Sequence, residues 1–224
     1  MELLELLKKV TKTFNSHGFF LYAVGGTVRD FLLGKEVKDF DFVTDATPEE
    51  MESFLENYNN VFKRFGVMIC KFDNTRIEIT TLRQETSYKD SRHPDKITFV
   101  NNISEDYLRR DFTINALYMD YKGKLYDFCN GLEDLNKKTI RVIGDVDKRM
   151  KEDPLRILRA IRFSMILDFE LEDNLDTYIQ NNIDLLKKLN VEKIKQEITK
   201  MMNYDQDKTN VLLNKYKINL FNIN

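Results

Sequence analysis

Two short segments near the amino end carry residue types that could bind a metal ion and a phosphate group. Gly25 and Gly26 follow an apolar run and precede Arg29, whereas Asp39 and Asp41 stand two positions apart in an alternating segment. Side chains two positions apart in a strand point to the same face, so the two carboxylates would lie side by side. They would repel each other without a cation between them. Mg²⁺ takes such oxygen ligands and bridges to substrate phosphates, so the acid pair predicts a divalent-metal site.

The glycine pair predicts the other half of the same site. Glycines let backbone N–H groups approach a triphosphate, and Arg29 could form an ion pair with it. Each feature also has a simpler explanation, because Gly-Gly is often only a turn and an acid pair on a strand is often an exposed polar face. Phe40 and Phe42 account for the opposite face but leave the clustered acids unexplained. Together, the order and spacing favour metal-dependent transfer of a nucleotide.

A second motif, Arg109–Arg110–Asp111, places two guanidinium groups and an acid before an apolar stretch. An isolated motif of this kind would be a structural ion pair at the start of a helix. Beside a metal site, Arg110 could instead bind phosphates and Asp111 a ribose hydroxyl. Both interpretations remain open at the level of sequence.

A third motif begins at Asp153 and continues with arginines at every third position, at Arg156, Arg159 and Arg162. Pro154 fits the first turn of a helix, which makes Asp153 a natural N-cap. Steps of three residues sweep the arginines around the helix surface, and four apolar residues are left for the core. The predicted core residues of this helix are Leu155, Leu158, Ile161 and Met165.

Asp153 and Arg156 could also read the edge of a nucleobase. A carboxylate accepts a hydrogen bond from an exocyclic amine, and a guanidinium donates to ring acceptors. Cytosine and adenine both offer an amine beside a ring nitrogen, whereas uracil and guanine place a carbonyl oxygen where the carboxylate would repel it. The pair could therefore accept C and A and refuse U and G without a nucleic-acid template.

The elements that must position these residues change in kind along the chain. Strands are predicted at 19–24, 39–44, 67–72, 76–81, 97–100, 117–120 and 125–128, with helices at 1–14, 28–33 and 48–58. Residues 82–98 show no period and are predicted to form a mobile loop. Helical patterns dominate afterwards, at 145–151, 154–167, 173–188, 191–202 and 208–216. The pattern predicts a mixed α+β part and a helical part that meet near residue 140.

Composition excludes several classes of protein. The 224 residues are 42% hydrophobic, which suits one or two globular domains, and no apolar run approaches the roughly 20 residues of a membrane span. The first residues lack the order of a signal peptide, and Cys70 and Cys129 offer no disulfide or zinc framework, so we expect a cytoplasmic location and no membrane partner. The presence of only two histidines argues against a histidine-based triad or zinc site.

Charge argues against a general nucleic-acid binder but leaves one candidate surface. The formal net charge is −2, yet residues 137–162 hold nine Lys or Arg and four Asp or Glu. The excess could be a solvated helix face. Any polyanion that the protein handles is expected to contact this segment.

From Leu21 to about Met202 the chain resembles the class II tRNA nucleotidyltransferases. These are the bacterial and eukaryotic CCA-adding enzymes with their poly(A) polymerase, CC-adding and A-adding relatives. Five motifs occur in order: the glycine turn with Asp39 and Asp41, Arg109 to Ala116, Asp127 to Leu135, Glu152 to Arg156 with Arg159 and Arg162, and a weaker one at Glu192, Lys193 and Glu197. Lys193 departs from the arginine usual in the family, which weakens the fifth motif.

The resemblance implies an α+β protein with two domains. Residues 1–139 would form a polymerase-β-like nucleotidyltransferase head with a mixed sheet, and residues 140–224 an all-helical neck that selects the nucleotide. Asp39 and Asp41 would be catalytic and hold the metal. Glu78 would be a third acid beside them or a solvent-facing strand carboxylate. The implied nucleotide-binding residues are Gly26, Arg29, Arg110, Asp111, Asp153, Arg156, Arg159 and Arg162.

The implied activity is Mg²⁺-dependent addition of C, C and A to the tRNA 3′ end from CTP and ATP, with release of pyrophosphate. Alternatives are an A-adding or oligo(A)-adding enzyme and a catalytically vestigial RNA-binding module. The segment 90–94 resembles the family's loop for A addition. The family's body and tail domains, which bind the tRNA, are absent from this sequence. Three explanations are left open: a truncated chain, a compact enzyme, or a separate chain that binds the tRNA. Weak, salt-sensitive tRNA binding is therefore expected. The oligomeric state is left open.

Overall fold

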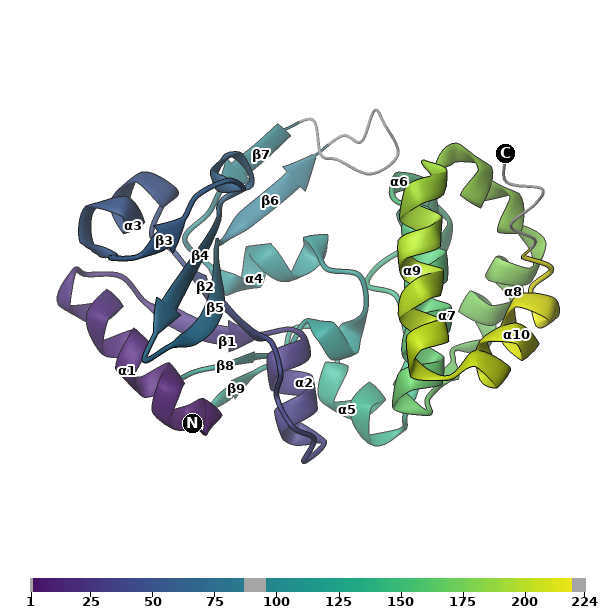
Figure 1. Cartoon of the computed structure of the whole chain (residues 1–224), viewed down its shortest axis with the longest axis horizontal. Helices are drawn as coiled ribbons and strands as arrows, with labels where there is room; N and C mark the ends of the chain where they lie inside the picture. The colour runs from purple at the N-terminus through teal and green to yellow at the C-terminus, as the bar shows by residue number, and fades with distance from the viewer. Residues whose placement is uncertain (1, 87–95, 219–224) are drawn as a thin grey trace. The chain divides into compact units, whose positions relative to one another are not determined.

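A computed structural model of the chain describes residues 2–86 and 96–218, which fall into two compact units (Figure 1). Of the described residues, the first unit contains those up to 85, 96–110 and 114–132, and the second contains Thr86, 111–113 and 133–218. The chain therefore passes from one unit to the other between Leu132 and Glu133, after a brief earlier crossing at Asp111. The functional domains with bounds at 139 and 140 stay a prediction.

The first unit is built on a mixed seven-stranded sheet in the order β3-β4-β5-β2-β1-β8-β9. Only β2 and β5 pair in parallel; the other neighbours are antiparallel. A mixed sheet agrees with the sequence prediction. The strands are β1 (Leu21–Val24), β2 (Phe40–Thr44), β3 (Tyr58–Asn59), β4 (Val67–Phe72), β5 (Thr75–Thr81), β8 (Tyr118–Met119) and β9 (Leu125–Tyr126).

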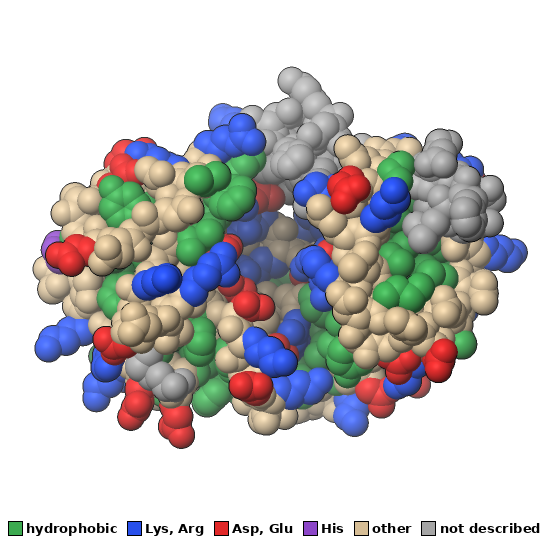
Figure 2. Space-filling view, viewed as in Figure 1, with side chains coloured by type: hydrophobic (Ala, Val, Ile, Leu, Met, Phe, Trp, Pro, Cys, Tyr) green, Lys and Arg blue, Asp and Glu red, His purple; other side chains and the backbone are tan. Residues whose placement is uncertain are grey.

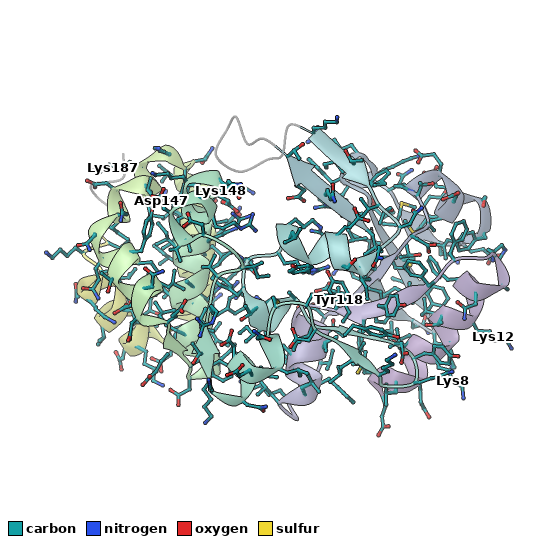
Figure 3. All side chains as sticks on the ribbon, turned by 180° about the vertical axis from the view of Figure 1, so that it is seen from behind. Lys8, Lys12, Tyr118, Asp147, Lys148 and Lys187 are labelled. Carbon is teal, nitrogen blue, oxygen red and sulfur yellow. The ribbon has the colours of Figure 1, made fainter. Side chains whose placement is uncertain are left out.

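Helix α1 (Leu3–Ser16) packs beside β1 and confirms the amphipathic pattern of the first residues. Its apolar side buries Leu6, Leu7, Val10 and Phe14 completely. Its polar side carries Lys8 and Lys12, which are exposed (Figure 3). The periodicity of the sequence was sufficient to find this helix because one side of it faces the core along its whole length.

Helix α3 (Pro48–Phe54) begins as its sequence predicts but ends early. Thr47 and Glu50 form a reciprocal capping box at its start. The predicted extension to Tyr58 is wrong because Leu55 is already extended and Asn57 has a φ of 53°, in the left-handed region. Tyr58 instead opens strand β3, which pairs with β4.

The segment predicted as a mobile loop is partly a sheet. Strands β6 (Arg83–Thr86) and β7 (Lys96–Phe99) form a separate two-stranded sheet. Arg83 also donates its backbone N–H to the Asp106 carboxylate, a contact distant in sequence that no local pattern reveals. Residues 87–95, which include the segment 90–94, lie outside the described residues.

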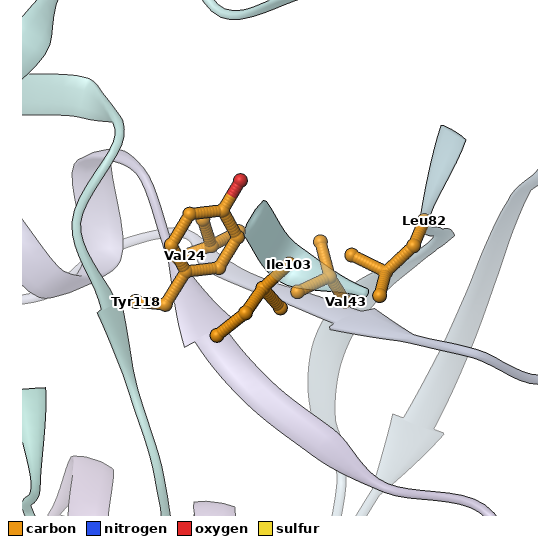
Figure 4. Close-up of a cluster of buried hydrophobic side chains, with 5 residues drawn as sticks. All are labelled: Val24, Val43, Leu82, Ile103 and Tyr118. Atoms are coloured by element: carbon orange, nitrogen blue, oxygen red, sulfur yellow. The ribbon is translucent and has the colours of Figure 1, made fainter. Parts of the chain in front are cut away.

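A buried apolar cluster lies along the sheet where β1, β2 and β8 meet (Figure 4). It contains Val24, Val43, Leu82, Ile103 and Tyr118. Ile103 comes from the short helix α4 (Ile103–Asp106), which continues into the 3₁₀ turns η2 (Tyr107–Arg109) and, further on, η3 (Thr113–Asn115). The cluster therefore ties the Arg109–Arg110 motif to the sheet that carries the acid pair.

The second unit is mainly helical, as predicted. Its helices are α6 (Val146–Glu152), α7 (Leu155–Leu167), α8 (Asp173–Asn181), α9 (Val191–Tyr204) and α10 (Gln206–Lys215), and α5 (Gly131–Asn136) leads into it. The helix predicted over 173–188 is interrupted at Asn182 and continues as the 3₁₀ helix η4 (Ile183–Lys188). A short parallel pair, β10 (Thr139–Ile140) and β11 (Glu170–Leu171), is an addition that the sequence did not predict.

Acidic and basic side chains are interspersed over the visible surface of each unit (Figure 2). Within residues 2–86 and 96–218, no helix is both long and apolar enough to span a membrane.

Candidate active site

The glycine turn after β1 is lined by two arginines. Gly25 has a φ of 68°, a backbone conformation that favours glycine, and it precedes helix α2 (Gly26–Leu32). A Cβ atom on Gly25 would lie 3.7 Å from Nη1 of Arg110, and one on Gly26 would lie 3.5 Å from Nη2 of Arg29. The turn therefore brings its backbone within reach of two guanidinium groups, which is an arrangement suited to a polyanion.

Arg29 is buried and held by two partners in its own unit. Its Nε and Nη2 atoms donate to the two carboxylate oxygens of Asp30 at 2.8 and 2.9 Å. Its Nη1 donates to the side-chain oxygen of Asn115 at 2.6 Å. The sequence placed Arg29 at this turn but did not reveal the partners that fix its orientation.

Thr27 links the glycine turn to the acid pair, a role that the sequence analysis missed. Its hydroxyl donates to the backbone carbonyl of Asp39 at 2.9 Å and accepts from the backbone N–H of Asp41 at 2.8 Å. Both acids are thus held at the start of β2 by the first turn of α2. The only available signal was a hydroxyl residue directly after the glycine pair.

The acids of β2 lie beside a further acid on the neighbouring strand. Asp41 is in register with Glu78 of the parallel strand β5, so their side chains share a face. Burial, followed by the charges of Glu78 and Asp39, raises the pKa of Asp41 to about 6, although Arg110 and Arg76 act in the opposite direction. Phe42 is buried on the other face, as predicted. The result is a concentration of negative charge near the glycine turn.

This acid cluster, defined as Asp39, Asp41 and Glu78, fits Mg²⁺ by its chemistry. No group of three or more His, Cys, Asp or Glu in the described residues is arranged to hold a metal by itself. Mg²⁺ is commonly bound by one or two carboxylates with substrate phosphates and waters as its other ligands, so Asp39 and Asp41 suffice as a protein donor set. A cation there would offset the charges of Glu78 and Asp39, which together with burial raise the pKa of Asp41.

Two residues that the sequence analysis overlooked accept hydrogen bonds from Arg110. Its Nη2 donates to the Asp106 carboxylate at 2.9 Å, and its Nε donates to the Tyr118 hydroxyl at 3.0 Å. Asp106 and Tyr118 are both fully buried. The sequence gives no signal for this contact. Asp106 is one acid within a charged segment, and it meets Arg110 and Tyr118 only in the folded chain.

Asp111 belongs to the second unit, unlike its neighbour Arg110. Its carboxylate accepts from Nε of Arg159 at 2.8 Å and from the backbone N–H of Phe112 at 2.8 Å. The structural ion pair that the sequence left open for this motif is therefore present, and its partner lies on α7. The ribose-binding role of Asp111 remains a prediction.

The other two arginines of α7 also have partners within the second unit. Arg162 donates to the Glu197 carboxylate at 2.7 Å, and Arg156 donates from Nη1 to the backbone carbonyl of Arg149 at 2.7 Å. The guanidinium carbons of Arg159 and Arg162 lie 5.3 and 4.4 Å from the centre of the Phe163 ring. The side chains predicted for the helix core, Leu155, Leu158, Ile161 and Met165, are buried.

Asp153 lies just before α7. The helix begins at Leu155 with Pro154 as the N-cap residue, one position later than the sequence predicted. Asp153 nevertheless accepts the backbone N–H of Leu155 at 3.1 Å, so it satisfies a donor of the first turn. This hydrogen bond supports a capping role for Asp153. Base reading by Asp153 stays a prediction.

The family motif from Asp127 to Leu135 has a clear local role. The Asp127 carboxylate accepts the backbone N–H groups of Cys129, Gly131 and Leu132 at 3.1, 2.9 and 2.9 Å. These bonds fix the loop that leads into α5, at the place where the chain passes between the units. The role of Asp127 is therefore to fix the backbone conformation of this loop.

Comparison with known proteins identifies the family of the chain. The family model of the poly A polymerase head domain matches residues 21–141. The CCA-adding enzyme of Lactobacillus helveticus is 46% identical over 192 residues, which are 86% of this chain and 48% of that protein. The crystal structure of the Bacillus stearothermophilus CCA-adding enzyme in complex with CTP has a TM-score of 0.82 at 33% identity and covers 90% of this chain and 49% of that one.

A structure of a tRNA nucleotidyltransferase complexed with a primer tRNA and an incoming ATP analog is similar as well. It has a TM-score of 0.76 at 34% identity, over 95% of this chain and 60% of that chain. The chain spans about half the length of the curated relatives it matches.

Proposed function

Because the chain belongs to the poly A polymerase head domain family, we propose that it catalyses template-independent addition of C, C and A to the 3′ end of tRNA. The substrates are CTP and ATP, and pyrophosphate is released. The names of the relatives support this choice, since they are CCA-adding enzymes and solved complexes contain CTP or a primer tRNA with an ATP analog.

One observation in the first unit carries the proposal. The glycine turn, with Arg29 and Arg110 beside it, lies close enough to the acid cluster for Arg110 to lower the pKa of Asp41. Positive groups suited to a triphosphate and negative groups suited to a metal are thus neighbours. Phosphoryl-group transfer depends on this combination of positioning and charge stabilisation.

Asp39 and Asp41 would hold Mg²⁺, which when bound neutralises charge on the triphosphate and lowers the pKa of the attacking hydroxyl. Arg110, Arg29 and the backbone at Gly26 bind the triphosphate and orient its α-phosphate. Thr27 keeps the two acids at a fixed distance from the turn through its two backbone hydrogen bonds. The protein thus contributes mainly orientation and electrostatic stabilisation.

The reaction forms one phosphodiester bond and breaks one phosphoanhydride bond. The terminal ribose hydroxyl of the tRNA attacks the α-phosphate, its proton is lost to solvent, and pyrophosphate leaves with the β- and γ-phosphates. Arg29 and Arg110 stay paired with the departing pyrophosphate, whose charge rises as the bond breaks. The arginines are therefore most useful at the step where charge develops.

In the second unit, Asp153 and Arg156 select the base, and Arg159, Arg162 and Asp111 complete the nucleotide-binding set. The near-complete burial of Arg156 and its bond to the Arg149 carbonyl support this role, because a fixed guanidinium discriminates better than a mobile one. The bond between Asp111 and Arg159 orders a second guanidinium on the same helix.

Incubation with tRNA that lacks its 3′ CCA tests the proposal. The protein is mixed with Mg²⁺ and each of CTP, ATP, UTP and GTP, alone and together, and the RNA product is sequenced. Addition of C, C and A from CTP plus ATP is expected. Addition of A alone, or of an A tract, would replace the proposal with an A-adding or oligo(A)-adding activity, and no addition under any condition would contradict an enzymatic role.

A further inference from the structure

We infer that Asp106 and Tyr118 are positioning residues that set the guanidinium of Arg110 for the triphosphate. The inference rests on the proposed function, since it assigns residues behind the proposed triphosphate site. It concerns two side chains that the motif pattern does not single out and that contact no substrate. Their effect on the substrate passes through Arg110.

The first step of the argument is the hydrogen bonding of Asp106. One of its carboxylate oxygens accepts from Nε and Nη2 of Arg110 at 3.1 and 2.9 Å and from the Tyr118 hydroxyl at 2.8 Å. The other accepts from Nε of Arg109 at 2.8 Å and from the backbone N–H of Arg83 at 3.1 Å. Asp106 is 0% exposed, so its carboxylate depends on these donors and has no contact with bulk solvent.

The second step is the electrostatic state of Asp106. Burial alone would favour the neutral acid, yet the Arg109 and Arg110 guanidinium groups hold the pKa of Asp106 well below its usual range. A buried carboxylate that stays ionised is a fixed anion, and it holds the nearest guanidinium in a defined place. Arg110 meets this anion through the side of its guanidinium group that carries Nε and Nη2.

The third step is the direction of the remaining nitrogen. Nη1 of Arg110 is the atom that lies beside the glycine turn, 3.7 Å from where a Cβ of Gly25 would be. Thus one side of the guanidinium group faces the buried carboxylate and the other faces the turn. Asp106 therefore determines which nitrogen Arg110 presents at the turn.

Tyr118 gives this arrangement a rigid base. Its ring belongs to the buried apolar cluster, and its hydroxyl projects from that cluster (Figure 4). The hydroxyl accepts from Nε of Arg110 at 3.0 Å and donates to Asp106. Tyr118 lies among the strands of the first unit (Figure 3), so the core of the sheet supports the position of Arg110. A functional group is held best when its support is itself locked by packing.

The test compares the affinities for CTP and CMP, measured by calorimetry with the full chain. Tyr118→Phe keeps the ring in the core and removes only the hydroxyl. We expect it to weaken CTP binding about 3- to 10-fold, the effect of one hydrogen bond, and to leave CMP binding unchanged. Asp106→Asn should weaken CTP binding at least about tenfold, again without a matching loss for CMP, and its melting temperature is measured to show that it folds.

Tyr126→Phe is the matched control, because its hydroxyl lies on the adjacent strand and bonds Asp120 instead of an arginine. It should leave the CTP-to-CMP affinity ratio unchanged. In an Arg110→Ala background, Tyr118→Phe should have no further effect on that ratio. Such non-additivity is expected if Tyr118 acts through Arg110, and a purely structural role would not produce it.

Two results overturn the inference in distinguishable ways. If the unmodified protein binds CTP and Arg110→Ala weakens that binding, but Tyr118→Phe keeps the normal CTP-to-CMP ratio, the positioning role is wrong and the proposed function stands. If the unmodified protein binds no CTP in the presence of Mg²⁺, the proposed function fails and the positioning role fails with it.

Discussion

The acid cluster of the first unit and the arginine pairs of the second unit are opposite arrangements of charge. In the second unit, Arg159 and Arg162 each meet a carboxylate, those of Asp111 and Glu197. In the first unit, the acid cluster brings like charges together, and burial, followed by the charges of Glu78 and Asp39, raises the pKa of Asp41 to about 6. Removing one partner of a buried ion pair destabilises a fold, whereas like charges gathered on neighbouring strands reduce its stability while both are present. The like charges of the acid cluster therefore destabilise the metal-free protein, and a bound cation would reduce that destabilisation.

The largest expected effect comes from removing an acid of the cluster. Asp41→Ala and Asp39→Ala should each reduce nucleotide addition to below a few per cent of normal, because each removes a proposed metal ligand and no core contact. The rate of CTP incorporation into tRNA is the measurement. Asp73→Asn, an exposed acid in the turn between β4 and β5, is the control and should retain full activity. Substantial activity in a folded Asp41→Ala protein would rule out the metal site.

A smaller effect is expected at Asp153. If it reads the base, Asp153→Ala should relax the preference for C and A over U and G about 10- to 100-fold, because one bidentate reader contributes about 1–3 kcal/mol. Incorporation of all four nucleotides is measured together with the melting temperature. Asp145→Ala is the matched control, because Asp145 caps α6 through the backbone N–H of Lys148.

The control separates the two roles of Asp153. Loss of a cap alone costs about 1 kcal/mol of stability and leaves the base preference as it was. Asp145→Ala should show only this loss. If Asp153→Ala behaves in the same way, Asp153 is a cap and has no part in base selection.

Stability should depend on pH in a way that identifies Asp41. Its folded pKa of about 6 lies above the ordinary value of 3.8, so the metal-free folded state holds the proton more tightly than the unfolded state does. The stability that comes from the protonated form is fully present below about pH 4 and is lost as the pH rises through about 6. Asp41→Asn should therefore unfold with a free energy about 1–3 kcal/mol higher than the unmodified protein at pH 7, and equal to it near pH 4.

Chemical denaturation at both pH values, without divalent metal, measures this difference. Adding Mg²⁺ at pH 7 should narrow the gap, since the cation stabilises only the protein that has the carboxylate. A gap of the same size at pH 4 and pH 7 would show that the amide acts through packing and not through charge.

Removing a paired charge in the second unit should lower the free energy of unfolding, whereas Asp41→Asn should raise it at pH 7. Glu197→Gln removes the partner of the mostly buried Arg162 and should lower the free energy of unfolding by about 1–3 kcal/mol. Glu192→Gln, an exposed position on the same helix, should change it by less than about 0.5 kcal/mol. If Glu197→Gln is as stable as the unmodified protein, the pairing of Arg162 with Glu197 does not stabilise the fold, and the contrast between the two units is not one of stability.

The sequence predicted what local patterns can encode. The strands β4 and β5 and the buried side of α7 were found because alternation and helical spacing are repeated over many residues. The glycine turn and the acid pair were found because their residue types stand close together in the chain. The early end of α3 at Phe54 was missed, since it depends on a left-handed residue at Asn57 that composition does not demand.

What the sequence could not predict were the partners of the candidate residues. Arg159 and Asp111 are 48 residues apart, and Arg162 and Glu197 are 35 apart, so neither pair has a local signature. For the same reason β6 was mistaken for loop, and the buried carboxylate of Asp106 escaped notice altogether. Roles were suggested by local motifs, but the contacts that orient those motifs required the folded chain.

Binding of Mn²⁺, as a spectroscopic substitute for Mg²⁺, tests the central claim most directly. Electron paramagnetic resonance of Mn²⁺ with CTP should show binding that strengthens as the pH rises through about 6, because the Asp41 carboxylate must lose its proton to bind the ion. Asp41→Asn should abolish the protein-dependent signal, and Asp73→Asn should keep it. Equal Mn²⁺ binding by the unmodified protein and by Asp41→Asn would contradict the account.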